Sequence, residues 1–126
     1  MEIHRIIIAG GRNFSDWEMF QSVIKRKLSR LPKHEIEIVC GGCSGADQMA
    51  EEYASMIGLK SKVFMADWDK HGKAAGPMRN AEMAVYSDYL IAFWDGSSRG
   101  TKNMIGLARK GGLKVYVKRY EANRKM

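Results

Sequence analysis

The segment IEIVCGGCSGADQMAEEYA, residues 36–54, joins a short apolar tract to a helical pattern through a run of small residues. The tract at residues 36–40 is rich in β-branched side chains and lacks a clean alternation of apolar and polar residues, which is typical of a parallel strand buried on both faces. Apolar residues from Ala46 to Ile57 then recur at helical spacing, and Gly58 is suited to cap the helix. A strand, a glycine-rich turn and a helix in this order predict one unit of an α/β sheet.

The same unit recurs along the rest of the chain. Further strands are predicted at residues 5–10, 62–66, 89–94 and 113–118, where apolar tracts are rich in β-branched or aromatic side chains. Strict alternation of strands and helices favours a mainly parallel sheet with helices on both faces. The predicted fold class is therefore α/β: a Rossmann-like three-layer α/β/α domain with a five-stranded sheet. We assign it to residues 1–118, and residues 119–126 to a basic C-terminal tail.

The helices between these strands have recognisable ends. Ser15 and Glu18 have the spacing of a capping box, and Pro32 ends the helix that they open. Pro77 is typical of the first turn of a helix that runs to about Tyr86. A last helix is predicted at residues 101–110, before two consecutive glycines.

Composition limits the class of protein. The 126 residues are 45% hydrophobic and 28% charged, as in ordinary globular domains, and no stretch approaches the roughly 18 apolar residues of a membrane span. We therefore expect a cytoplasmic protein with no membrane partner.

The net charge of +7 favours anionic partners. The pair Cys40 and Cys43 lacks a second pair of ligands at suitable spacing, so no metal site is expected.

Glycine-rich segments follow three of the predicted strands, at residues 10–12, 41–45 and 96–101. The carboxyl ends of parallel strands share one edge of the sheet, where ligands of such folds bind. Backbone amides at a helix start have no hydrogen-bond partners within the helix and attract anions, and glycine has no side chain to keep a phosphate from them. These segments are therefore predicted to bind an anion. The alternative is that the glycines serve turn geometry alone.

The connection at residues 66–80 adds polar side chains to the same edge. Arg79 would lie in the first turn of a helix, where the helix dipole repels a cation, so an anion nearby would explain it. The alternative is a surface arginine paired with Glu82 or Asp88. Trp94 ends a strand and is suited either to stack on a base or to fill the core. The candidate ligand-binding residues are Gly10, Gly11, Arg12, Gly41, Gly42, Ser44, Gly45, Asp47, His71, Lys73, Arg79, Asn80, Trp94, Gly96, Ser97, Gly100 and Thr101.

Four motifs in order resemble the YspA/YpsA-related branch of the SLOG superfamily: IIIAGGRNFSD, IVCGGCSGADQMAEEYA, ADWDKHGKAAGPMRNAEMA and DYLIAFWDGSSRGTKNMI. This superfamily includes the Lonely Guy phosphoribohydrolases and the DNA-processing protein DprA. The resemblance extends over residues 5–117 and implies a Rossmann-like domain that binds nucleotides or nucleotide-derived ligands at its glycine loops.

The resemblance is carried over at individual positions. It matches the phosphate-loop glycines to Gly41, Gly42 and Gly45, and the arginine of the hydrolases to Arg79. It matches the second glycine loop only in part, because Ser97 stands at the position of its middle glycine. The catalytic glutamate of the hydrolases is replaced by Met104, which can neither transfer a proton nor stabilise a cationic centre.

The resemblance and the residues together predict a binding protein for a small phosphorylated nucleotide derivative, for example an ADP-ribose-type signal in the conflict between phage and host. Arg12, Lys73 and Arg79 would bind phosphates, Asp47 would accept hydrogen bonds from the ribose, and Trp94 or Trp68 would contact the base. No further cofactor is expected, and a homodimer is a plausible assembly.

Two alternatives stay open. One is a nucleoside-monophosphate phosphoribohydrolase that uses Arg79 with Glu82, Asp47 or Asp95 as the acid. The other is single-stranded DNA binding, as in DprA, which the positive charge favours.

Overall fold

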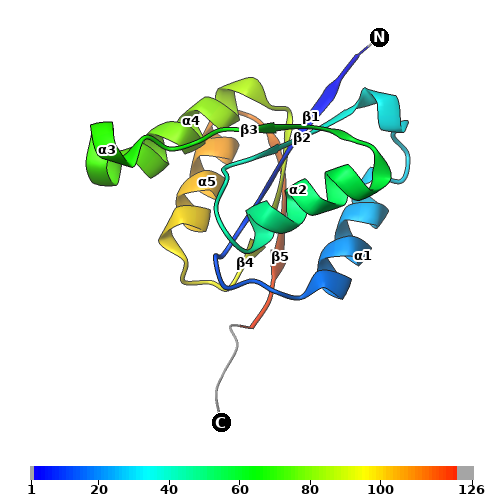
Figure 1. Ribbon diagram of the computed structural model, residues 1–126, viewed down its shortest axis with the longest axis horizontal. Helices are drawn as coiled ribbons and strands as arrows, with labels where there is room; N and C mark the ends of the chain where they lie inside the picture. The colour runs from blue at the N-terminus through cyan, green and yellow to red at the C-terminus, as the bar shows by residue number, and fades with distance from the viewer. Residues whose placement is uncertain (1, 122–126) are drawn as a thin grey trace.

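The computed structural model describes residues 2–121 and contains one five-stranded sheet, shown in Figure 1. Its strands are β1 (His4–Gly10), β2 (Ile36–Cys40), β3 (Lys60–Val63), β4 (Tyr89–Trp94) and β5 (Lys114–Arg119). They lie in the order β3-β2-β1-β4-β5, and every neighbouring pair is parallel. The predicted Rossmann-like α/β fold is confirmed.

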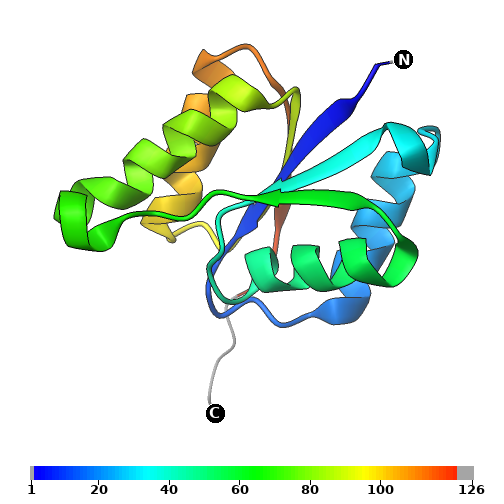
Figure 2. The same cartoon turned by 45° about the horizontal axis from the view of Figure 1, so that its top comes forward.

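Helices cover both faces of the sheet. Figure 2 shows α1 (Trp17–Leu28) and α2 (Ala46–Ile57) on one side, and α4 (Ala75–Tyr86) and α5 (Arg99–Lys110) on the other. The short elements are η1 (Lys33–Glu35), α3 (Trp68–His71) and η2 (Gly72–Ala74). In residues 2–121, none of these helices combines the length and the apolar character that crossing a bilayer requires.

The central strand β1 explains why its sequence is a continuous apolar run. Ile6 and Ile8 pack into the core beneath α1 and α2, whereas Ile7 and Ala9 pack into the core beneath α4 and α5. Alternate side chains of one strand thus fill two separate cores. Burial of each isoleucine stabilises the folded state by about 1.5–3 kcal/mol. The strand β1 therefore stabilises the packing of both helical layers on the sheet.

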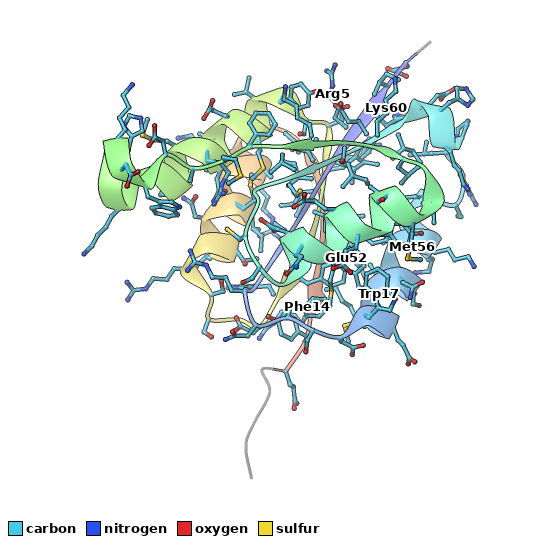
Figure 3. All side chains as sticks on the ribbon, in the orientation of Figure 1. Arg5, Phe14, Trp17, Glu52, Met56 and Lys60 are labelled. Carbon is cyan, nitrogen blue, oxygen red and sulfur yellow. The ribbon has the colours of Figure 1, made fainter. Side chains whose placement is uncertain are left out.

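Aromatic rings close the first core at the carboxyl ends of the strands. Phe14 stacks on Phe93 at a centroid distance of 4.8 Å, and Trp17 stacks on Phe20 at 5.7 Å. Both residues are labelled in Figure 3: Phe14 lies on the segment between β1 and α1, and Trp17 is the first residue of α1. These contacts fix the connection that leads from β1 past the candidate site.

Several element boundaries differ from the prediction. The third strand occupies residues 60–63 instead of 62–66, because it is an edge strand whose exposed Lys60, Ser61 and Lys62 need no apolar character. The predicted capping box is wrong: α1 is capped by Asp16, whose carboxylate accepts a hydrogen bond from the Met19 amide at 3.0 Å.

The last two helices are close to the prediction. α4 runs from Ala75 to Tyr86, so Pro77 lies in its first turn as predicted, and η2 leads directly into it. α5 starts at Arg99 instead of Thr101, because the Ser98 side chain caps it by accepting a hydrogen bond from the Thr101 amide.

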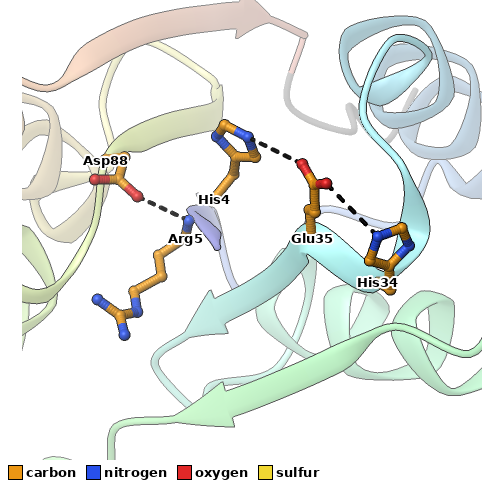
Figure 4. A network of polar contacts seen from close by, with 5 residues as sticks. All are labelled: His4, Arg5, His34, Glu35 and Asp88. Carbon is orange, nitrogen blue, oxygen red and sulfur yellow. Dashed lines mark hydrogen bonds and ion pairs between the residues drawn. The ribbon is translucent and has the colours of Figure 1, made fainter. Parts of the chain in front are cut away.

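Both ends of the described chain are held to the sheet. Figure 4 shows Glu35 near His4 and His34, with Nε2–oxygen distances of 3.8 and 3.6 Å, and the Arg5 amide donating to Asp88. At the other end, β5 extends through Arg119, and Tyr120 packs against Phe14. The tail predicted from residue 119 therefore begins within the fold, and residues 122–126 lie outside the described residues.

Candidate functional site

A cavity of about 710 Å³ opens at the carboxyl edge of the sheet, between the segments that follow β1 and β4. The chain runs from β1 to β2 and β3 on one side and places β4 on the other, so this is the point where the strand order reverses. Open α/β sheets bind ligands at such a point, in cavities of about 300–1,000 Å³. Nine predicted ligand-binding residues line it: Gly10, Gly11, Arg12, Asp47, Arg79, Asn80, Ser97, Gly100 and Thr101.

Arg79 lies on α4 with its side chain at the wall of this cavity, and the residue is only 8% exposed. Its Nε donates to Asn80 Oδ1 at 3.0 Å, and its Nη1 donates to the Gly41 carbonyl. Among the described residues no carboxylate forms an ion pair with this guanidinium, so the expected alternative of a surface pair with Glu82 or Asp88 is wrong. A buried cation held by neutral acceptors keeps much of its charge available to an anion.

Asp47 lies in the first turn of α2 and is also buried beside the cavity. Its Oδ2 accepts hydrogen bonds from the amides of Gly41 and Cys43, at 3.1 and 3.2 Å. Burial raises the pKa of this carboxyl to about 6, although those two amides and the nearby Arg79 act in the opposite direction. The expectation of free amides in this loop is therefore wrong at these two positions, because the chain supplies its own acceptor.

The glycines of this loop serve close packing of the backbone. A Cβ atom added at Gly41 would lie 2.7 Å from Arg79 Nη1. Gly45 has a φ of +76°, and a Cβ there would lie 2.2 Å from the Gly11 carbonyl oxygen. The loop after β2 and the loop after β1 thus touch directly, and no side chain fits between them.

The segment after β4 is organised by Asp95. Its Oδ1 accepts hydrogen bonds from the amides of Ser97 and Ser98, both at 2.8 Å, and these bonds lower the pKa of the carboxyl. The Ser98 side chain then caps α5. The first residues of α5, Arg99 and Gly100, line the cavity, and a helix start carries amides without partners in the helix and a partial positive charge.

Asn80 connects the two helices that form one side of the cavity. Its Nδ2 donates to Asn103 Oδ1 at 2.9 Å and to the Gly100 carbonyl at 3.4 Å, while its Oδ1 accepts from Arg79. One amide side chain therefore orients the buried guanidinium and fixes the start of α5 relative to α4.

The two tryptophans, either of which was expected to contact a base, differ in their position relative to the cavity. Trp94 does not line the cavity: its Nε1 donates to the Ser98 carbonyl at 3.1 Å, and the Arg119 guanidinium lies 5.3 Å from its ring. Trp68 does line the cavity, is 48% exposed, and lies over Gly76 at the start of α4. The aromatic surface available to a ligand is thus that of Trp68.

The remaining predicted residues lie outside the cavity wall. They are Gly41, Gly42, Ser44, Gly45, His71, Lys73 and Gly96. Glu82, the acid suggested for an enzyme, is exposed on α4 and is not brought together with Arg79 in the cavity. Met104, at the position of the hydrolase glutamate, is buried at the cavity wall.

Sequence reasoning missed several lining residues: Asn13, Arg99, Asn103 and Tyr120. Arg99 was detectable in principle, because it directly follows Ser98, a residue type that caps helices. Tyr120 had no such signal, because it stands where a tail was expected.

A parallel sheet with helices on both faces and a cavity where the strand order reverses defines the class of Rossmann-like α/β domains. The chain belongs, more specifically, to the YspA, cpYpsA-related SLOG family, whose model matches residues 4–71. It is 33% identical over 119 residues to the Gene 61 protein of Mycobacterium phage D29, a match that covers 90% of this chain and 94% of the phage protein.

Among solved structures, DNA processing protein A (DprA) from Streptococcus pneumoniae is similar, with a TM-score of 0.73 and 19% identity. The similarity covers 91% of this chain and 50% of the DprA chain, so this protein spans half the length of that structure. At this identity the comparison shows the shared fold.

Proposed function

We propose that the cavity binds a nucleotide or nucleotide-derived ligand through a phosphate group placed between Arg79 and the start of α5. The observation that carries this proposal is the guanidinium of Arg79, which is buried at the cavity wall with neutral hydrogen-bond partners. A charge-assisted hydrogen bond to such a group contributes about 1.5–3 kcal/mol.

Neighbouring groups support an anion at the same place. The start of α5 adds the amides of Arg99 and Gly100, and the side chains of Arg12 and Arg99 add positive charge at the rim. The family membership and the DprA-like fold support a nucleotide-related or DNA-binding role.

Trp68 provides the surface for a base. It is half-exposed at the cavity rim, and the lack of a side chain at Gly76 lets its ring lie close to α4. A base stacked on this ring would gain about 1–3 kcal/mol. The ligand we propose therefore spans from Trp68 to Arg79, with its sugar near Asp47.

Isothermal titration calorimetry with AMP, ADP, ADP-ribose and adenosine tests the proposal. We expect saturable binding of at least one phosphorylated compound, no comparable binding of adenosine, and a loss of about tenfold or more in affinity for Arg79→Ala. Lys73→Ala is the matched control, because Lys73 is an exposed cation of the same region outside the cavity wall. Equal affinity of Arg79→Ala and the unaltered protein would overturn the proposal.

A second candidate is N-glycosidic cleavage of a nucleoside monophosphate, which the carboxyl of Asp47 favours. Its pKa of about 6 suits proton transfer near neutral pH, and the residue lines the cavity. Incubation with nucleoside monophosphates, followed by chromatography for the free base, tests this activity. Release that disappears in both Arg79→Ala and Asp47→Asn would establish an enzyme; no release would leave a binding protein.

A further inference from the structure

A second cavity, of about 420 Å³, lies beside the amino-terminal halves of β4 and β5, toward the end of the sheet opposite the candidate site. We call it the basic groove. It runs between the last turn of α1 with the residues that follow and the starts of these two strands. Its floor is apolar: the half-buried Leu31, Tyr89 and Tyr116 form the part that a partner could reach, and the buried Leu28 and Ile91 lie beneath them.

The basic groove lies where the sheet is incompletely covered. α5 packs against β4 and β5 from one face of the sheet. On the other face, Tyr116 of β5 is half-buried and meets the last turn of α1 through Arg26 and Lys27. In the part of the chain that the structure describes, no further helix covers this side of β5 (Figures 1 and 2).

The rim of the groove has a single sign of charge. Lys27, Arg30 and Lys114 line it, all three are exposed, and none of its lining residues is acidic. Lys27 Nζ lies 3.8 Å from the centre of the Tyr116 ring, and Lys114 Nζ lies 5.9 Å from that of Tyr89. The ammonium groups therefore lie over the aromatic floor, where an acidic side chain of a partner would meet them.

We propose that the basic groove is a docking surface for an acidic amphipathic helix of another protein. An apolar stripe of that helix would pack on Leu31 and on the edges of the two tyrosine rings, and flanking carboxylates would pair with Lys27, Arg30 and Lys114 above them. The proposal concerns a different surface from the nucleotide cavity and does not depend on it.

Two other occupants fit less well. A single-stranded nucleic acid needs open aromatic faces for its bases, and Lys27 already covers the face of Tyr116. A second copy of this chain, paired through the same groove, would bring the same three cations together and repel itself.

Nuclear magnetic resonance titration of the full chain tests the proposal. The probe is a synthetic helix of about 15 residues with leucines at i, i+3, i+4 and i+7 and glutamates on both flanks. We expect saturable shift changes in the amides around Leu31, Tyr89 and Tyr116. A scrambled peptide of the same composition, without the apolar stripe, should not saturate.

Charge-reversal variants test whether the peptide binds at the basic groove. Lys27→Glu combined with Lys114→Glu should weaken peptide binding by about tenfold or more. Lys60→Glu combined with Lys110→Glu makes the same change of net charge at exposed positions outside the groove and should leave binding within about twofold. Absence of saturable binding, equal binding of the scrambled peptide, or equal loss in both double variants would overturn the proposal. Tighter binding of an oligothymidylate in the same groove would also overturn it, in favour of nucleic acid.

Discussion

Asp47 and Arg79 are the two buried charged residues beside the cavity, and they do not form a direct ion pair. Each is held mainly by backbone groups of the loop after β2: the carboxylate accepts from amides, and the guanidinium donates to a carbonyl. The loop therefore separates the charges while keeping both near the ligand.

The raised pKa of Asp47 makes stability depend on pH. The pKa is about 6 in the folded protein and 3.8 as the ordinary value, so between pH 4 and pH 6 the folded state binds more protons than the unfolded state. Stability then falls as pH rises through this window and levels off above it. The shift from 3.8 to about 6 corresponds to a loss in the free energy of unfolding on the order of 3 kcal/mol across this window.

Asp47→Asn removes this titration and keeps an oxygen acceptor for the amides of Gly41 and Cys43. We expect the stability of the variant, relative to the unaltered protein, to rise between pH 4 and pH 6 by up to that amount. Urea unfolding at several pH values measures it. A constant difference across the window would contradict the assigned pKa.

Two glycine substitutions test the distinction between close packing and chain flexibility. Gly45→Ala should destabilise the protein by about 2 kcal/mol or more, because its φ is positive and the added Cβ would meet the Gly11 carbonyl. Gly106→Ala, within α5 and with open space around it, should stabilise by about 0.5–1 kcal/mol. Thermal unfolding of both variants compares them directly; a mild effect at Gly45 would show that the two loops separate easily.

At the level of single residues, the sequence predicted much of the cavity wall but explained some of it wrongly. Arg79 and Thr101 were chosen from local pattern, and both line the cavity. The role of Gly41 depends on Arg79, which is 38 positions away, and no local pattern contains that contact. Trp94 was ambiguous for the same reason, since its partners Ser98 and Arg119 are set by the tertiary fold.

At the level of elements, the start of α1 offers a test between the predicted cap, Ser15, and the observed cap, Asp16. Asp16→Ala should cost about 1 kcal/mol of stability, because its carboxylate accepts from the Met19 amide. Ser15→Ala should change stability by less than about 0.5 kcal/mol. Chemical denaturation of the two variants decides between the caps, and a larger loss at Ser15 would restore the capping box.

Element types were predictable because buried parallel strands and amphipathic helices have strong, distinct patterns. β3 was displaced by two residues at its start because an edge strand pairs on one side and need not be apolar. The prediction extended to residue 66 because Phe64 and Met65 are apolar, but both residues follow the strand. The Phe64 amide still donates a hydrogen bond to the Cys40 carbonyl.

At the scale of the whole molecule, the net charge of +7 and the buried position of Arg79 predict two different responses to salt. Binding of a single-stranded oligonucleotide by the exposed cations should be weak and fall steeply with added salt. Binding of a nucleotide at Arg79 should fall much less, because a buried charge is screened less. Fluorescence anisotropy from low to physiological salt measures both; tight oligonucleotide binding at physiological salt would favour a DNA-binding function.

The carboxylate of Asp47 also has a consequence for how many phosphoryl groups one chain can hold. Parallel α/β folds can offer several helix starts along one edge, but here Asp47 places a carboxylate in the first turn of α2, where it binds the amides of Gly41 and Cys43 in the preceding loop and disfavours an anion. A phosphoryl group would therefore gain the most binding free energy between the start of α5 and Arg79. We therefore expect a stoichiometry of one ligand per chain, with any second phosphoryl group of a longer ligand directed outward toward solvent.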